Sequence, residues 1–538
     1  MRIVNRIGSL VLVLSIIGTT QFSNATGKRN LFEDLNSAQK DVNKLVTIAA
    51  ESPHVDEGIL LQVKTEIDRM YKFLYNINSS VYSIDDTKSQ GLPIIQKSFE
   101  LRRWLRKVVT VWNREEALKN LKNGPEVVAS VRNLMRAGRY LEDVIAESML
   151  MKQTTSSGSS AKHGADFIAV SNLLNSSPQS ADLKSRLSLL TTRGFQGGRA
   201  FDFNSFQSGD ILLFRGASSI SAAIARITDS VTQFSHVAIV YVDPTTKQKF
   251  ILESLIDKGV IIRPLVHALD HSLPRISIYR FDDAKIAHVA AEETYKYIKR
   301  LSKNGKVKIK YDFSMNLTDH SRIFCSELVA MAFDLAAKKL ALGKDRLAPV
   351  PYFSNSFLSK ENRNFLQRIT ISDDTTIAFA PGDIDVDPRF DLLAEYRDFS
   401  KTEQVRVHDL IFDKVFEWTE KDKRKLKESF WMNPIAYVAY QVSSFEPLKA
   451  VLSKAGLPID PDIKPSLVRT ILILEFTKRG FEKPIYEFVA RFKDTYKFSP
   501  PPKLIYQQLE FLKNQNGGRY LKLFPIAKNS EIVKESGY

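Results

Sequence analysis

The spacing of apolar residues changes twice along the 538 residues of the chain. Over residues 30–151 the apolar side chains recur every three or four positions, which is typical of amphipathic helices. From about residue 203 to 340 short apolar segments are separated by turns and are followed by one helical segment after Phe324. Helical spacing then returns toward the C-terminus. We therefore expect an α+β fold, with one α+β domain flanked by helical regions on both sides.

Composition places the boundaries of these parts. We expect a signal peptide at residues 1–25, a helical region at 30–151, and a linker and irregular segment at 152–202, which begins with a run of Ser, Thr and Gly. The α+β domain is predicted at 203–345, and a mainly helical C-terminal region at 346–538. Within that last region we expect helix from about Leu392, with breaks at its proline clusters.

The first 25 residues predict export. Arg2 and Arg6 precede an apolar run at residues 7–17, and Ser23 and Ala25 place small residues where a signal peptidase cuts. Later segments have no uninterrupted apolar run of about 20 residues, so we expect no transmembrane segment after cleavage. The only cysteine, Cys325, lies far from the cleavage site, which argues against a lipid anchor there. We expect a periplasmic or extracellular protein of a bacterial envelope.

The net charge of +16 favours anionic partners. Loss of Arg2 and Arg6 with the signal peptide would leave +14, and an anionic envelope surface suits an exported chain with this excess. Nucleic acid is not expected, because no zinc-finger or RNP-like motif occurs. A basic balance can also serve solubility alone, so charge is a weak guide to function.

Cys325 is a single thiol in a chain with an export signal, where paired cysteines are the rule. It lies at the start of a predicted buried helix. Two interpretations are open: Cys325 fills a packing position as a small apolar residue, or it is a thiolate activated by the helix N-terminus.

His236 and Glu253 lie in two predicted strands joined by a turn at residues 243–246, with proline at its second position. A four-residue loop would pair His236 directly with Glu253 on one face of the hairpin. The carboxylate would then accept the imidazole N–H and stabilise the imidazolium. A slip of one residue would put the two side chains on opposite faces. With Cys325, the pair would form a Cys-His-Glu nucleophilic triad.

Other histidines offer weaker sites. His267 and His271 have the spacing of a zinc-binding pair, but the glutamate that a metalloprotease needs next to the first histidine is absent. His320 is a rival base close to Cys325 in sequence. The basic run at 421–427 fits a solvated helix face better than a polymer contact. No phosphate-binding or dinucleotide motif occurs, and we expect no cofactor and no metal.

Together these segments resemble the circularly permuted NlpC-type papain-like cysteine hydrolases, the YiiX-like group. The resemblance is carried by Gly209-Asp210-Ile211-Leu212, Phe234-Ser235-His236-Val237-Ala238-Ile239-Val240, Leu252-Glu253-Ser254, Tyr311-Asp312 and Phe324-Cys325-Ser326-Glu327-Leu328-Val329. As in that group, the cysteine helix follows the histidine strand. The resemblance implies a small antiparallel sheet packed on the nucleophile helix, with Cys325 as nucleophile, His236 as general base and Glu253 or another polar residue as the third member.

The resemblance also implies thiol-dependent acyl transfer. We expect an exported hydrolase that cleaves an amide, or an ester or thioester, with a cell-wall peptide as the first candidate substrate. An acyl-lipid hydrolase or acyltransferase on the same core is the alternative, and a non-catalytic binding or scaffold protein is a third. The backbone N–H of Cys325 is the expected first oxyanion donor. Tyr311 is the candidate for the second, or simply packs.

Overall fold

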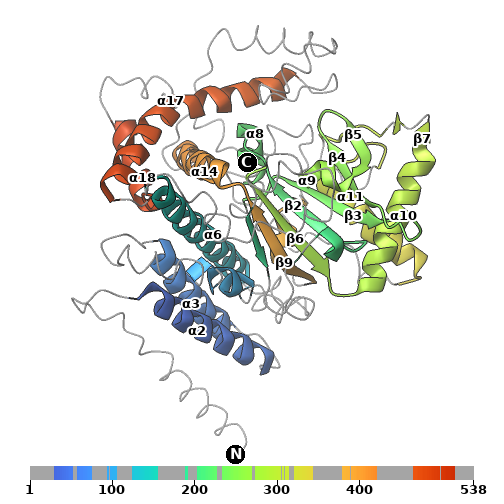
Figure 1. The fold of residues 1–538 in the computed structure, drawn as a ribbon, viewed down its shortest axis with the longest axis horizontal. Coiled ribbons are helices and arrows are strands. Elements are labelled where there is room, and N and C mark those ends of the chain that lie inside the picture. The colour runs from blue at the N-terminus through green and yellow to red at the C-terminus, as the bar shows by residue number, and fades with distance from the viewer. Residues whose placement is uncertain are drawn as a thin grey trace, which may run out of the picture.

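The helices lie on both sides of a central sheet (Figure 1). The computed structural model describes residues 30–51, 57–75, 94–95, 97–103, 105, 124–155, 188–191, 201, 203–226, 233–269, 273–303, 306–307, 309–313, 320–342, 379–387, 389–420, 465–496 and 499–514. The helices of more than eight residues are α2 Leu31–Glu51, α3 Glu57–Tyr75, α6 Gly124–Thr155, α10 Ala284–Leu301, α11 Cys325–Lys339, α14 Phe399–Glu420, α17 Pro465–Tyr496 and α18 Pro502–Asn514.

The sheet has seven strands in the order β1-β9-β6-β2-β3-β4-β5, and every neighbouring pair is antiparallel. Its strands are β1 Ser188–Thr191, β2 Ile211–Arg215, β3 His236–Val242, β4 Lys249–Leu255, β5 Gly259–Pro264, β6 Arg275–Phe281 and β9 Phe390–Arg397. The predicted α+β fold, with an antiparallel sheet packed on the Cys325 helix and helical regions on both sides, is confirmed.

Two strands of this sheet come from outside residues 203–345. β1 belongs to the segment expected to be a linker, and β9 pairs with β6 along the whole length of β6. The prediction of helix from about Leu392 is wrong for the first residues, because the strand continues to Arg397 and α14 begins at Phe399. β9 is buried on both faces, so its apolar residues do not alternate with polar ones in the way that would identify a half-exposed strand.

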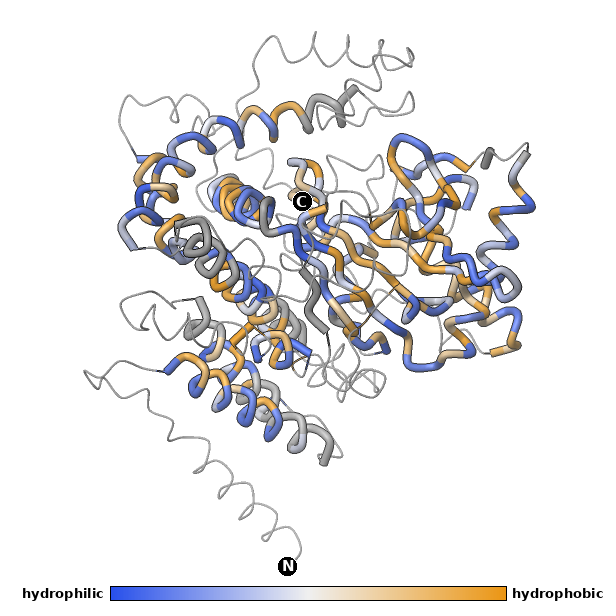
Figure 2. The backbone as a smooth tube through the Cα atoms, in the orientation of Figure 1, coloured by the Kyte–Doolittle hydropathy of each residue, from blue (hydrophilic) through white to orange (hydrophobic). Residues whose placement is uncertain are grey.

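Alternate residues of each strand pack on opposite faces of the sheet. On one face, α10 and α11 cover residues such as Leu213, Val237 and Ile239. On the other face, Phe214, Ala238 and their neighbours pack with the short helix α9, Leu265–Leu269. Hydrophobic residues accordingly follow the strands through the centre of Figure 2. The two faces fix which side chains of β3 and β4 can meet.

The helical regions have apolar packing of their own. α3 packs against α6, and α14 packs against α17 and α18 around Leu410, Trp418 and Phe481. Among the described residues, no helix is both long enough and apolar enough to cross a membrane.

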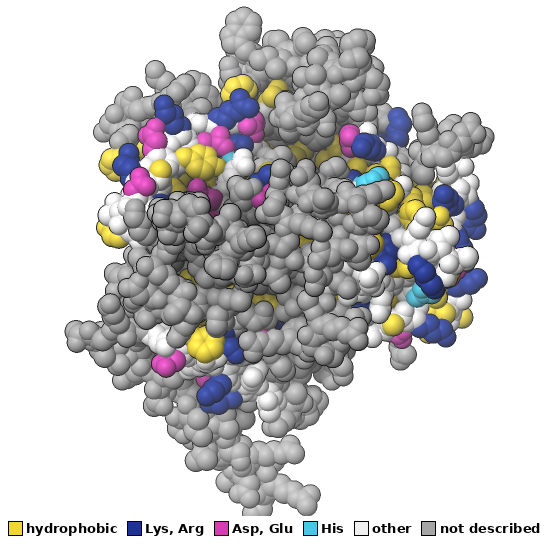
Figure 3. Space-filling view, in the orientation of Figure 1, with side chains coloured by type: hydrophobic (Ala, Val, Ile, Leu, Met, Phe, Trp, Pro, Cys, Tyr) yellow, Lys and Arg dark blue, Asp and Glu magenta, His cyan; other side chains and the backbone are white. Residues whose placement is uncertain are grey.

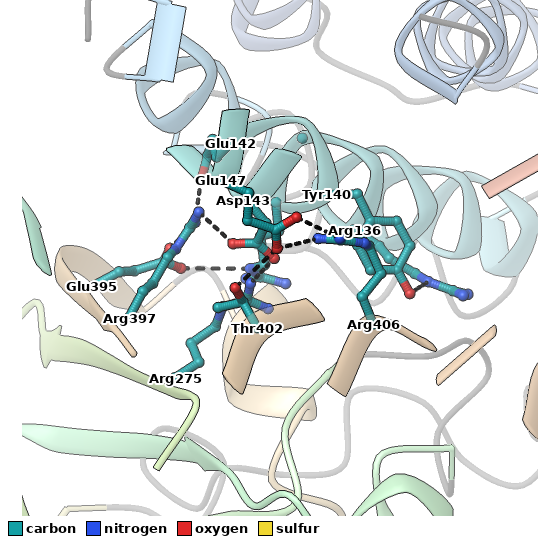
Figure 4. Close-up of polar contacts among 12 residues, drawn as sticks. Arg136, Tyr140, Glu142, Asp143, Glu147, Arg275, Glu395, Arg397, Thr402 and Arg406 are labelled. Carbon is teal, nitrogen blue, oxygen red and sulfur yellow. Dashed lines mark hydrogen bonds and ion pairs between the residues drawn. The ribbon is translucent and has the colours of Figure 1, made fainter. Parts of the chain in front are cut away.

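Buried ion pairs join the helical regions to the sheet. Glu395, in β9, contacts three guanidinium groups, those of Arg102, Arg139 and Arg397. Arg102 also forms a two-point contact of 2.9 Å with Glu142 of α6, and both side chains are fully buried. Figure 4 shows the part of this network in which Glu142, Asp143 and Glu147 of α6 face residues of β9 and α14.

The pairs extend along α6. Arg275 of β6 donates to Asp143 at 2.7 Å, and Arg406 of α14 makes two contacts with Glu147, at 2.7 and 2.6 Å. Burial by itself would raise the pKa of Glu395, but the surrounding arginines outweigh burial and hold that pKa well below its ordinary value. Because each buried charge has partners, the network specifies how α6 lies on the sheet.

Replacing Arg102 by methionine should lower the free energy of unfolding by about 3–5 kcal/mol, because Glu142 and Glu395 would lose a shared buried partner. The neighbouring substitution Arg103→Met is the matched control. It removes a pair with Asp391 that is much more exposed, and should cost less than about 1 kcal/mol. Urea unfolding followed by circular dichroism measures both, and equal losses would contradict the role given to the buried network.

Candidate functional site

Cys325 is the first residue of α11, where the backbone N–H groups have no partner within the helix. The residue before it, Phe324, donates its backbone N–H to the carboxylate of Glu327 at 3.1 Å, which holds the first turn. The Cys325 side chain is 4% exposed. The helix N-terminus favours the ionised form of the thiol, whereas its buried position disfavours that form.

The β3–β4 hairpin differs from the predicted one in its loop. The prediction of a four-residue loop is wrong, because Val242 pairs with Lys249 and six residues, 243–248, connect the strands. Lys247 adopts a positive φ of 58° and donates its N–H to Asp243 O at 3.0 Å. The side chain of Asp243 accepts two more backbone N–H groups, at 2.9 and 2.8 Å. This wider turn moves the register by two residues.

A shift of two residues keeps every side chain on its predicted face. The register places Glu253 diagonally across from His236 instead of directly opposite, and both lie on the Phe214 face. His236 Nε2 lies 2.9 Å from Glu253 Oε2. The ring of Phe214 stacks on the imidazole at 5.4 Å between centroids. The structure therefore brings the predicted histidine and glutamate together through a different register.

Cys325 lies near His236 at the first residues of β3, which are not paired with β4. The pairing of β3 with β4 begins at Ile239, and the backbone N–H of Val237, just before that point, is hydrogen-bonded to the Cys325 thiol. The imidazole of His236 and the hydroxyl of Tyr311 also lie next to the thiol. Ser326 Oγ lies 3.9 Å from the sulfur. Four groups thus surround it.

The segment just before Tyr311 is held by backbone hydrogen bonds to β5 and to the residues before α11. The carbonyl of Ile309 accepts Val260 N–H at 3.0 Å, and the carbonyl of Lys310 accepts Ile323 N–H at 3.0 Å. Gly259 has a φ of +67°, and a Cβ atom there would lie 2.1 Å from the Ile309 carbonyl oxygen. Only glycine lets the segment approach β5 this closely, so Gly259 contributes to the placement of Tyr311.

Arg263 is a site residue that the sequence reasoning missed. It lies in β5, on the same face as Glu253, and its Nε donates to Glu253 Oε1 while His236 contacts Oε2. The Glu253 side chain is only 1% exposed, so both of its oxygens depend on these partners. The turn between Leu255 and Gly259 was the signal available, since a second hairpin there puts Arg263 on the face of Glu253.

The contacts shift the pKa values of all three groups. Burial on its own would raise the pKa of Cys325, but the hydrogen bond and charge of His236 outweigh burial and lower it. Burial would lower the pKa of His236, yet its contacts with Cys325 and Glu253 raise that pKa to about 9. Burial would raise the pKa of Glu253, and its contacts with His236 and Arg263 lower it. The two shifts act in the direction of a thiolate and imidazolium ion pair.

The other histidines and the basic run predicted as candidate site residues do not belong to this cluster, and some of them lie outside the described residues. His320 is half exposed and its Nδ1 lies 2.9 Å from Glu327 Oε1, a contact on the Glu327 side of α11. His267 is exposed, while His271 and the run at 421–427 lie outside the described residues. Within the described ranges, no group of His, Cys, Asp and Glu could hold a metal ion.

Comparison with known families identifies part of the chain. Residues 205–347 match the family described as permuted papain-like amidase enzyme, YaeF/YiiX, C92 family. The match confirms the resemblance on a segment that contains Cys325, His236, Glu253 and Tyr311, and this is a family of papain-like cysteine hydrolases. No curated protein and no solved structure matches the chain.

The Cys325 thiol should react with iodoacetamide below pH 8.5, the ordinary pKa of a free thiol, because the contact with His236 lowers the pKa of Cys325. In His236→Gln the charge is lost and burial dominates, so alkylation should become fast only above that pH. Because Cys325 is the only cysteine, every labelled molecule reports this site. Rates measured from pH 5 to 10 test the prediction, and coincident profiles for the two proteins would contradict it.

Removing the guanidinium in Arg263→Met should move the acid limb of the same alkylation profile to higher pH by about one unit. Glu253 would lose a cation and take up a proton at higher pH, which withdraws its support from the imidazolium. Arg263→Lys should keep the wild-type limb.

The control for loss of a similar ion pair is Arg280→Met. Arg280 pairs with buried Asp210 at 2.7 Å and has nearly the same exposure as Arg263. If Arg280→Met moves the limb as far as Arg263→Met, the effect belongs to general destabilisation of the sheet.

Proposed function

We propose that residues 205–347, which form a domain of the permuted papain-like amidase family, hydrolyse an acyl bond with Cys325 as the nucleophile. His236 acts as the general base and acid, and Glu253 orients the imidazole. The observation that carries the proposal is the arrangement around one buried sulfur: His236 lies next to the thiol and its Nε2 is 2.9 Å from Glu253 Oε2. This arrangement supplies an activated nucleophile and a proton donor.

The reaction starts from the thiolate and imidazolium pair. The sulfur attacks the carbonyl carbon and the carbonyl oxygen takes up the negative charge. The backbone N–H of Cys325 is suited to stabilise that oxygen because it lies at the start of α11 and has no intrahelical acceptor. The Tyr311 hydroxyl, which contacts the resting sulfur, is proposed as the second donor. The imidazolium then gives its proton to the leaving amine or alcohol as the bond breaks.

Water completes the cycle. Neutral His236 takes a proton from water, and the resulting hydroxide attacks the thioester carbon. The second tetrahedral intermediate collapses, which releases the carboxylic acid and restores the thiolate beside the imidazolium. Glu253 keeps the ring oriented through both halves, and its contact with Arg263 leaves the other oxygen facing His236.

The finer parts of the proposal concern substrate and location. We propose an exported enzyme of the bacterial envelope, since the first 25 residues have the pattern of a signal peptide, and a cell-wall peptide amide as the first substrate class. Acyl lipids are the second class, favoured by a basic surface next to the site that is described below. A scaffold without activity is the third possibility, disfavoured by the perturbed pKa values of Cys325 and His236.

The test uses wild type, Cys325→Ala and Tyr311→Phe with three sets of compounds: purified cell-wall peptides, N-acyl amides and acyl-ester lipids. Products are read by mass spectrometry. Wild type should release product from one set, and Cys325→Ala should lower the rate by at least about 10³-fold. Tyr311→Phe should lower kcat by roughly 10²-fold with KM nearly unchanged, as for loss of one oxyanion donor.

Matched melting temperatures of the three proteins control for folding. Turnover that persists unchanged in Cys325→Ala would exclude the mechanism. If wild type acts on none of the compounds and Cys325 also fails to react with a thiol probe, the result would favour the scaffold.

A further inference from the structure

A basic prong projects from the catalytic domain. Residues 294–310 contain seven Lys or Arg and no Asp or Glu, and we call this segment the basic prong. It comprises the last two turns of α10, the two short strands β7 Ser302–Lys303 and β8 Lys306–Val307, and Lys310. In Figure 1, β7 lies at the outer end of α10, at the right-hand edge of the molecule.

The helical part of the prong is amphipathic. Thr294 and Ile298 are buried against the sheet and α11, while Lys296, Lys299 and Arg300 are exposed. Figure 3 shows Lys and Arg side chains gathered along this right-hand edge of the molecule. Lys296 pairs with Glu292 and Glu293, at 3.0 and 3.2 Å, and its side chain stays exposed. The cations can therefore meet an extended partner.

Apolar and aromatic side chains lie among these cations. Leu301 is 42% exposed at the end of α10, and Tyr297 is partly exposed one turn before it. Tyr295 is also partly exposed, and the ammonium of Lys299 lies over its ring at 5.5 Å. Tyrosine, leucine and lysine together on one surface are typical of segments that enter the headgroup region of a bilayer.

The prong is continuous with the nucleophile site. It ends at Lys310, and the next residue is Tyr311, whose hydroxyl contacts Cys325. The hydrogen bonds of Ile309 to Val260 and of Lys310 to Ile323 connect the base of the prong rigidly to β5 and to the residues just before α11. A surface bound by the prong would be held next to the segment that carries Tyr311.

We propose that the basic prong binds the surface of a lipid bilayer that contains anionic headgroups. Lys and Arg neutralise the headgroups, each worth roughly a factor of five in binding, and the exposed Leu301 enters the interface. An anionic polymer would use the cations but would leave Leu301 without a role. The proposal does not depend on which bond Cys325 cleaves, because vesicle binding is measured without turnover.

The test is sedimentation of the protein with vesicles of phosphatidylcholine alone, or of phosphatidylcholine with about one-third phosphatidylglycerol. Wild type should bind only the anionic vesicles. The triple variant Lys296→Gln, Lys299→Gln, Arg300→Gln should bind them roughly a hundred-fold more weakly.

The matched control removes three exposed cations from the other end of the same helices: Lys285→Gln, Lys338→Gln, Lys339→Gln. Phe281, just before α10, packs on Phe333 of α11 at 4.8 Å, so these three cations lie away from the prong. The control should retain nearly wild-type binding. Equal loss in both triple variants would overturn the proposal in favour of net charge alone.

Two further measurements separate a bilayer from a polymer. Leu301→Ser should weaken vesicle binding several-fold while leaving binding to soluble polyphosphate unchanged. If Leu301→Ser binds vesicles as wild type does, or if polyphosphate competes fully at charge-matched concentration, the partner is an anionic polymer and the proposal fails.

Discussion

The fold depends on how one buried carboxylate is shared. Glu395 lies in the middle of β9 and contacts arginines from the N-terminal helical region and from its own strand. Burial of so many charges is tolerated only if each has a partner with good geometry. The strand that carries Glu395 is also the partner of β6, and its residues connect the sheet to α6. Arg406 and Glu147 in turn join α14 to α6. The helical flanks are therefore parts of the same folded unit as the sheet.

An arginine of the buried network contacts a residue near His236, and an arginine of β2 adjoins Phe214, which stacks on His236. The guanidinium of Arg139 lies 4.8 Å from the ring of Phe234, two residues before His236. Arg215, next to Phe214 at the end of β2, pairs with Asp409 of α14 at 2.6 Å. The strand that presents His236 is thus supported from the helical regions on one side, while α11 presents Cys325 from the other. This support is consistent with a site whose parts come from distant segments but meet within hydrogen-bonding distance.

The sequence predicts on which face of the sheet His236 and Glu253 lie, but not the register of the β3–β4 hairpin. His236 and Glu253 were placed together because strand side chains alternate, and a two-residue shift leaves that alternation unchanged. The six-residue loop requires a positive φ at Lys247, and the presence of a lysine does not predict that conformation. Arg263 reaches Glu253 through the second hairpin, β4–β5, whose turn lies between Leu255 and Gly259. The contact of Glu395 with Arg102 could not be predicted, because no local sequence pattern relates a carboxylate in a strand to an arginine 293 residues earlier in the chain.

Chain order gives the buried network a consequence for biosynthesis. Asp143 is made 254 residues before Arg397, its partner in the folded protein. A chain that emerges from its N-terminus therefore carries Arg102 and Arg139 without Glu395, and Asp143 without Arg397, until β9 has been made. His236, Glu253 and Cys325 are all synthesised before that point, yet the sheet that positions them lacks β9 and its ion pairs. Correct placement of the Cys325 thiol therefore depends on a strand some seventy residues further along the chain. A chain truncated before β9 would contain all three residues without the support of that strand.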